Sequence, residues 1–394
     1  MTTAAATPTS PVSADPSGNA DGYGRARLWV GISGVGTMVV ASTLALAIGL
    51  PGSWYGNLTI GTMLGAFFAW LGVYVLLQAP FDWLGGYILP TKFGRPVPAL
   101  GVWAAGWLRG VVVQAGLLGT IAVALTLAGH FGEWLGTVIV SLGCVVVLLW
   151  GRLALAWLVG GVRVGRRRAG EGVGMLAERV GLTEDASFTG GIVGVLRPRA
   201  SVLPAGYADA LGDEGVAVVR ERRAAAVRLG LWWRGRLVAV VFTVVGVALA
   251  AALVGNDRLG TAGATVELSL WFTLWSFAGL LVLPTLSRRA VEAIDRSLIA
   301  QGRDPESVDR VSRALNARQD GETHRPGLVE TIFHPIPSVE NRTDRDDTSA
   351  SSLLAAWDAA RSAVYVSAAG LGLLGRAVHC NAGKPALWVF LPTD

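Results

Sequence analysis

The sequence predicts a mainly α-helical protein: a polytopic transmembrane bundle of six or seven spans with a small cytoplasmic α+β region. Of its 394 residues, 52% are hydrophobic and only 15% are charged, whereas about a quarter of the residues are charged in a typical soluble protein. Between residues 28 and 81 there is no Asp, Glu, Lys, Arg or His, and about 20 apolar residues are enough to cross a bilayer core. A water-soluble enzyme is therefore excluded.

The cysteines and the net charge exclude further classes of protein. With only two Cys, Cys144 and Cys380, the chain cannot form a disulfide framework or a four-thiolate metal site. The net charge of +5 does not indicate a nucleic-acid partner, because the basic residues gather beside apolar runs, where orientation in the membrane explains them. The partner that the composition does indicate is the lipid bilayer.

The apolar runs define the spans in order. Residues 1–27 are rich in Ala, Thr, Pro, Ser and Gly, which predicts a disordered tail. The first run, 28–50, is long enough to remain as an anchor. A weaker candidate at 353–374 carries Asp358 and Arg361 on one face, and it is either a short span or a helix lying in the membrane interface. The other expected spans are 58–78, 102–128, 134–158, 237–254 and 268–286.

The basic residues orient these spans. Loops with an excess of Lys and Arg face the cytoplasm, so we expect the tail and both polar regions there, in the plasma membrane of a bacterium. The arginines that decide this are Arg163, Arg166, Arg167, Arg168, Arg234, Arg236, Arg288 and Arg289. The expected organisation is a tail (1–27), four transmembrane helices (28–162), a cytoplasmic insert (163–236), a transmembrane hairpin (237–286), a cytoplasmic helical region and linker (287–352), and a C-terminal apolar helix and tail (353–394).

Two arginines lie within expected spans. Arg109 and Arg152 are each within two turns of the cytoplasmic end of their span, which favours snorkelling toward the lipid headgroups. The alternative is an interior polar site, since a charge inside a span often marks function.

The first cytoplasmic region is expected to be a small α+β insert. Residues 172–180 have helical spacing, 192–196 form a short apolar strand, and a strand resumes at 201–203. A helix then begins near Tyr207, with acidic residues early and basic residues late, a polarity that suits the helix dipole.

Four segments, in this order, carry a resemblance to a known family. The segments are 79–84 with 92–94, 203–206 with 209–214, 287–289 with 295–296, and His334-Pro335 ahead of 339–342. Together they resemble the integral-membrane zinc metallopeptidases that include the CAAX prenyl endopeptidases and the HtpX-type membrane proteases. The resemblance implies a zinc ion held by the two His of a His-Glu-x-x-His helix and by a Glu on a second helix. It also implies that the Glu of the His-Glu-x-x-His motif is the general base.

The residues that would define this chemistry are missing. Aligned without gaps from Asp213-Glu214, the motif positions are Arg222, Arg223 and Ala226, and the position four residues before Asp295 is Val291. A register shifted by two residues gives Arg220, Glu221 and Ala224, which keeps the Glu but neither His. A guanidinium has no lone pair to give a metal. No zinc or other cofactor is therefore expected.

These observations predict a membrane pseudoprotease that binds or regulates membrane-protein segments or a partner protease without cleaving them. The strand at 192–196 is a candidate for holding an extended peptide by strand addition. Arg220, Arg222 and Arg223 either receive an acidic partner or anionic headgroup, or form a solvated helix face. A residual site would use Glu221, Asp295 and His334.

The alternative is an active metallopeptidase with relocated zinc ligands, drawn from His324, His334, Glu330 and Glu292. A transporter is disfavoured because the spans contain few polar groups.

Overall fold

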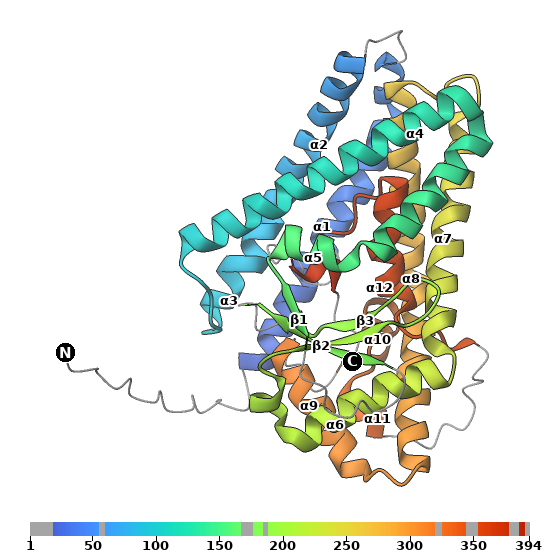
Figure 1. Cartoon of the computed structure of the whole chain (residues 1–394). Coiled ribbons are helices and arrows are strands. Elements are labelled where there is room, and N and C mark those ends of the chain that lie inside the picture. Colours follow the sequence, from blue (N-terminus) through green and yellow to red (C-terminus); the bar gives the residue numbers. More distant parts are fainter. Residues whose placement is uncertain are drawn as a thin grey trace, which may run out of the picture.

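A computed structural model describes residues 19–54, 60–166, 176–183, 188–319, 325–343, 354–377 and 386–390 (Figure 1). Within these residues, five helical segments are long and apolar enough to cross a membrane. Large apolar side chains such as Leu76, Val112 and Val147 remain exposed on their outer faces. Because exposed apolar surface of this extent needs an apolar solvent, the chain is an integral membrane protein. The helices are α1 (Asn19–Ala47), α2 (Ile60–Trp83) continuing through η2 (Leu84–Ile88) and α3 (Leu89–Lys92), α4 (Leu100–Trp150), α7 (Leu231–Val254) and α8 (Ala262–Ala300).

The first helix begins earlier than the sequence predicted. Residues 19–27 were expected to belong to a disordered tail, but α1 starts at Asn19. Tyr23 packs against Phe93, with ring centroids 5.5 Å apart, and the guanidinium of Arg95 lies 4.1 Å from the centre of the Tyr23 ring. These contacts with the loop after α3 order a turn of chain whose composition alone favours disorder.

The third and fourth expected spans are the two arms of α4. Its backbone bends at Glu133, whose φ of 50° and ψ of −140° are not helical, and the arms fold back at this point (Figure 1). The second arm ends at Trp150 rather than at residue 158, because Gly151 leaves the helical conformation and a separate helix, α5 (Arg152–Gly160), follows.

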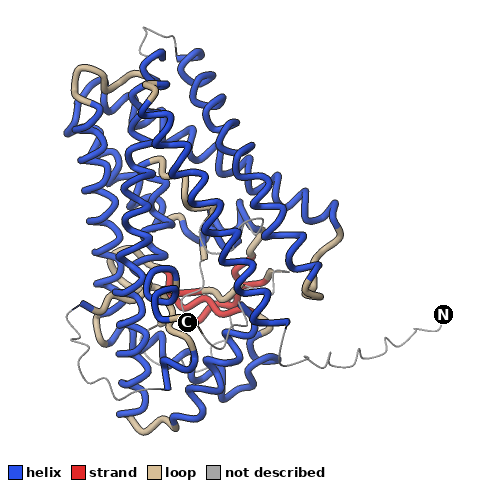
Figure 2. The backbone as a smooth tube through the Cα atoms, turned by 180° about the vertical axis from the view of Figure 1, so that it is seen from behind, coloured by secondary structure: helices blue, strands red, loops and turns tan. Residues whose placement is uncertain are grey.

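A four-stranded sheet lies at one end of the long helices, with shorter helices beyond it (Figures 1 and 2). Its order is β1-β2-β4-β3, with β2 and β4 parallel and the other pairs antiparallel. The helix expected over 172–180 is wrong for residues 177–180, which form part of β2: all four pair with β4, and 179 and 180 also pair with β1. The other residues of that expectation fall partly outside the described chain. The strands are β1 (Arg163–Arg166), β2 (Ala177–Leu182), β3 (Gly191–Val193) and β4 (Ala200–Pro204).

Shorter helices beyond the sheet complete this end of the molecule. The expected helix near Tyr207 is α6 (Tyr207–Arg228), which breaks at Gly212, where φ is +67°. Helix α8 runs unbroken through the expected domain boundary at residue 286, so that its second half leaves the apolar bundle and packs against α6. The remaining helices here are α9 (Pro305–Gln319), α10 (Gly327–Phe333) and α11 (Val339–Thr343).

The C-terminal segment, residues 354–377, is neither a span nor an interfacial helix. Its helix α12 (Ala359–Val366) has 8 residues and continues into a short 3-10 turn, η4 (Ser367–Gly370). Helix α12 contacts α7 and α8, and η4 contacts α4, so the segment lies inside the bundle (Figure 1). A last short helix, α13 (Ala386–Val389), lies against α5. The apolar residues that suggested a membrane span are buried against the protein's own helices instead.

Candidate functional site

Helices α6 and α8 meet through a buried ionic cluster. Arg222 Nε lies 3.1 Å from Asp295 Oδ1, and Arg342 Nη1 lies 3.6 Å from Asp295 Oδ2. Arg342 also donates to the Ser312 hydroxyl at 2.7 Å and to the carbonyl of Pro337 at 3.3 Å. We call these three residues the Arg222–Asp295–Arg342 cluster. It links α6, α8 and α11 through one carboxylate shared by two cations.

Arg223 performs a different task on the neighbouring face of α6. Its side chain is 0% exposed. Its guanidinium donates to Ser201 Oγ at 3.0 Å, to the carbonyl of Val202 at 2.7 Å and to the carbonyl of Thr189 at 2.9 Å. Since these acceptors belong to β4 and to the turn before β3, Arg223 fastens α6 to the sheet.

The expected exposed basic surface on α6 is therefore wrong. Arg222 and Arg223 are buried, and Arg220 pairs with Glu178 of β2, with 2.8 Å between Nε and Oε2. All three arginines contact their own chain, so this helix face offers no cluster of solvated cations to an acidic partner or to a headgroup.

The four motif positions do not fit a zinc ion. Arg222 and Arg223 are cations without a lone pair, while Ala226 and Val291 are apolar and belong to the same buried core. Zinc in proteins is held by Cys, His, Asp and Glu side chains. Among the described residues, no group of three or more such side chains lies close enough together to hold a metal ion. His324, a candidate relocated ligand, lies outside the described residues.

The three residues of the expected residual site have different contacts. Glu221 binds Arg303, with Arg303 Nε 2.9 Å from Glu221 Oε2, and this hydrogen bond raises the pKa of the Arg303 guanidinium. Asp295 is engaged in the ionic cluster. His334 is buried and lines a cleft with Arg325, Arg342 and Arg361. Among the described residues, Glu221, Asp295 and His334 do not form a group that could hold a metal ion.

Glu330, another candidate relocated ligand, has a structural role. Its carboxylate accepts hydrogen bonds from the Ser338 backbone N–H at 2.7 Å, from the Ser338 hydroxyl at 3.0 Å and from Asn341. These bonds close the loop between α10 and α11, and they direct the carboxylate oxygens to the protein's own donors.

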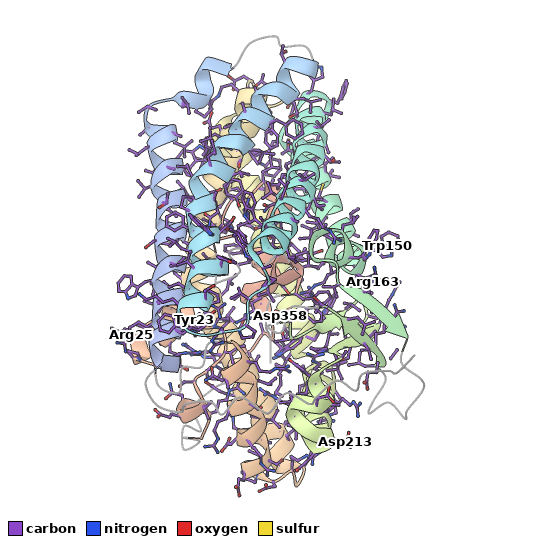
Figure 3. The ribbon with its side chains drawn as sticks, turned by 90° about the vertical axis from the view of Figure 1, so that its left-hand side faces the viewer. Tyr23, Arg25, Trp150, Arg163, Asp213 and Asp358 are labelled. Carbon is purple, nitrogen blue, oxygen red and sulfur yellow. The ribbon has the colours of Figure 1, made fainter. Side chains whose placement is uncertain are left out.

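The free edge of β3 is capped by an arginine. Ile192, on the strand expected to hold a peptide, offers its carbonyl at the sheet edge, where Arg236 Nη2 donates to it at 3.3 Å. Arg236 is held in turn by Ser362, at 3.1 Å, and by Asp358, at 4.0 Å. Figure 3 labels the buried Asp358 near the middle of the view and Asp213 toward its lower end. The expected strand addition at β3 is not supported at Ile192, because the side chain of Arg236 already binds the carbonyl there.

Arg109 and Arg152, the two arginines within the expected spans, have different surroundings. Arg109 donates to the carbonyls of Trp157 and Leu158 and so satisfies the last carbonyls of α5. Arg152 is 3% exposed, donates to the carbonyl of Val389 at 2.9 Å and lies over the rings of Tyr365 and Phe390. Snorkelling is therefore wrong for Arg152, which forms an interior polar site with the C-terminal segments.

Tyr365 of α12 shows how the C-terminal segment is held. Its buried hydroxyl donates to the carbonyl of Leu148 at 2.7 Å. Nothing in the sequence pattern at 359–366 indicates a neighbour on the second arm of α4.

Comparison with solved structures shows a likeness in fold. No known family model matches the chain, and no curated protein matches it in sequence. The structure is similar to the crystal structure of S. mikatae Ste24p, with a TM-score of 0.57 and 13% sequence identity over 79% of this chain and 80% of that one. This chain has a Ste24p-like fold. At this identity the likeness establishes the fold alone, so the chemistry of the site has to be argued from the residues present.

Proposed function

We propose that this chain is a membrane pseudoprotease: a Ste24p-like protein that binds or regulates membrane proteins without cleaving them. The Arg222–Asp295–Arg342 cluster carries the proposal. Ste24p is an integral membrane zinc metalloprotease, and the sequence resemblance assigns Arg222 and Arg223 to the motif positions of the zinc-binding helix. Here that helix is joined to α8 by ion pairs, with cations where the chemistry needs lone-pair donors.

The loss extends to the general base as well as the metal. Metal-assisted hydrolysis needs a Lewis acid to lower the pKa of water and a carboxylate to accept its proton. The ungapped motif puts Arg223 at the position of that carboxylate, and its guanidinium is committed to carbonyls of the sheet. In the shifted register the carboxylate is Glu221, which is bound to Arg303.

The surfaces left for a partner are the lipid-exposed helices and the other edge of the sheet. Strand β1 forms the edge opposite β3 in the sheet described, and it pairs with β2 on one side. An extended segment of a membrane protein near the cytoplasmic surface would add to β1 through backbone hydrogen bonds. We place the sheet and the helices beyond it in the cytoplasm of a bacterial cell, as the distribution of arginines predicts.

Metal analysis of the purified full-length protein tests the loss of catalysis. We expect no stoichiometric zinc and no peptide cleavage that a chelator abolishes, with an active membrane metallopeptidase purified in parallel as the positive control. Stoichiometric zinc that is lost in His334→Ala, together with chelator-sensitive cleavage, would overturn the proposal in favour of relocated ligands.

Photo-crosslinking in cells tests the binding. A crosslinking side chain at Val164 of β1 is expected to capture membrane proteins, whereas the same side chain at Ile192 of β3 is not, because Arg236 and the C-terminal segment cover that edge. Equal capture from both positions, or none from Val164, would contradict binding at β1.

A further inference from the structure

The end of the C-terminal segment brings a buried cation into the bundle. Arg376 is 0% exposed, and its guanidinium donates to Asp82 Oδ2, which is 294 residues away in the sequence. Asp82 also accepts a hydrogen bond from Trp107 Nε1 at 2.8 Å. Asp82 lies on α2 and Trp107 on α4, so two long helices hold the carboxylate in place independently of the C-terminal segment.

Three aromatic rings surround the same guanidinium. Its central carbon lies 5.3 Å from the ring centre of Trp388, 5.7 Å from that of Trp107 and 5.8 Å from that of Tyr74. Aromatic faces attract cations within about 6 Å, and the attraction increases when the pair is removed from water. We call Tyr74, Asp82, Trp107 and Trp388 the guanidinium cage.

The chemistry of the cage selects a planar cation. A guanidinium is flat, delocalised and weakly hydrated, so it can stack on rings while its edge binds a carboxylate, whereas an ammonium is compact and strongly hydrated. Two of the nitrogens of Arg376, Nε and Nη1, have no hydrogen-bond partner among the described residues. The rings therefore supply much of the interaction that replaces water for this side chain.

The bundle also holds the backbone of the segment that carries Arg376. Ser269 donates to the carbonyl of Leu371 at 2.7 Å, Ser141 donates to that of Ala369 at 3.2 Å, and the N–H of Leu373 donates to the Thr273 hydroxyl at 3.2 Å. Side chains of α4 and α8 thus bind this backbone in the way that a receptor binds a peptide.

The segment shows signs of a conformation imposed from outside. Asp358 and Leu371, which flank its helical part, have φ values of 63° and 58°. Residues other than glycine rarely adopt this left-handed conformation, and it persists only where the surroundings enforce it. With a helix of 8 residues, too short to be stable alone, the segment depends on the bundle for its structure.

We propose that the guanidinium cage is a binding site for a guanidinium group carried on an apolar peptide, and that residues 354–377 are its tethered ligand, bound through Arg376. The site goes beyond the proposed function, because its residues lie on α2, α4 and α13 and take no part in the Arg222–Asp295–Arg342 cluster. A cleft lined by Gln114, Gly375 and Trp388 shares Trp388 with the cage.

Chemical rescue of the full-length protein in nanodiscs tests the cage. Arg376→Ala is expected to lower the unfolding temperature by roughly 5–10 °C, since it leaves Asp82 buried without its cation. Millimolar methylguanidinium should restore part of this loss, while the same concentration of methylammonium should not. Arg376→Gln, which removes the charge but keeps the side chain as far as Cδ, serves if the alanine variant does not fold. Absence of rescue in either variant, or rescue that persists when Asp82→Asn is added, would overturn the proposal.

Hydrogen exchange distinguishes a tethered ligand from an ordinary part of the core. In Asp82→Asn we expect amide exchange to increase in residues 359–377 and to stay unchanged in α7, because the segment is released while the bundle remains. An equal increase in both regions, or no increase in either, would show that the segment is an integral part of the core and would overturn its assignment as a ligand.

Discussion

The Arg222–Asp295–Arg342 cluster and the guanidinium cage both bury arginine beside a single carboxylate, but they stabilise the charge in different ways. In the cluster, two guanidiniums share Asp295, and a hydroxyl and a carbonyl accept further hydrogen bonds from Arg342. In the cage, one guanidinium has one carboxylate, and aromatic rings supply the rest. Near the sheet, Arg342 finds a hydroxyl and a carbonyl as acceptors, whereas within the bundle aromatic rings surround Arg376.

The two sites also differ in what they join. The cluster links α6, α8 and α11 near the sheet, and α6 and α8 also share an apolar core. The cage joins two long helices to a segment that lacks extended structure of its own. We infer that loss of the cluster destabilises the fold as a whole, while loss of the cage releases a segment from an otherwise intact bundle.

The largest expected effect is that of Asp295→Asn. This substitution leaves Arg222 and Arg342 buried without a counter-charge, and breaking a buried pair in this way costs about 3–5 kcal/mol. The free energy of unfolding in detergent, followed by tryptophan fluorescence, measures the cost. Amide hydrogen exchange should increase in α6 and α11 as well as in α8, because these three helices are joined through the same carboxylate.

Asp213→Asn is the matched control for this substitution. Asp213 is exposed on α6, and surface substitutions of this kind change stability by about 0.5 kcal/mol or less. If Asp295→Asn were no more destabilising than Asp213→Asn, the cluster would contribute little, and its contrast with the cage would be lost.

The sequence was sufficient for much of the bundle. Apolar runs identified α1, α2, both arms of α4, α7 and α8, because a bilayer imposes a minimum length of apolar residues on each span. It failed where tertiary contacts override composition. Tyr23 orders the start of α1 through Phe93 and Arg95, and β2 forms because its neighbours pair with it, although its own residues have helical spacing.

The candidate site was harder to predict, since its pairings are long-range. The resemblance assigned Arg222 and Asp295 to the two helices of the family's zinc motif. Nothing in the sequence pattern indicated that Arg222 would bind Asp295 or that Arg342 would join them. Asp82 lies in segment 79–84 of the family resemblance, which suggested no binding partner for it. Arg376 lies in a glycine-rich stretch whose sequence has neither helical nor strand periodicity. A pair separated by 294 residues becomes visible only when the chain is folded.

A smaller effect is expected at Gly235, where α7 contacts the other end of the C-terminal segment. A Cβ atom at this position would lie 1.8 Å from the carbonyl oxygen of Trp357, too close for the segment to keep its place. Gly235→Ala should therefore destabilise the protein by about 1–3 kcal/mol, as overpacking does, and should increase amide exchange in residues 355–366.

Gly143→Ala on α4 is the matched control, because a Cβ there meets no atom within 4 Å and alanine favours a helix over glycine by roughly 0.5–1 kcal/mol. The comparison with the cage predicts that the two substitutions have opposite signs and that only Gly235→Ala releases the segment. Because Asp358 and Ser362 hold Arg236 against β3, the release should also expose the β3 edge, which a crosslinking side chain at Ile192 would then report. If Gly235→Ala left exchange in residues 355–366 unchanged, the segment would be fixed independently of its contact with α7, and release would have to begin at Arg376.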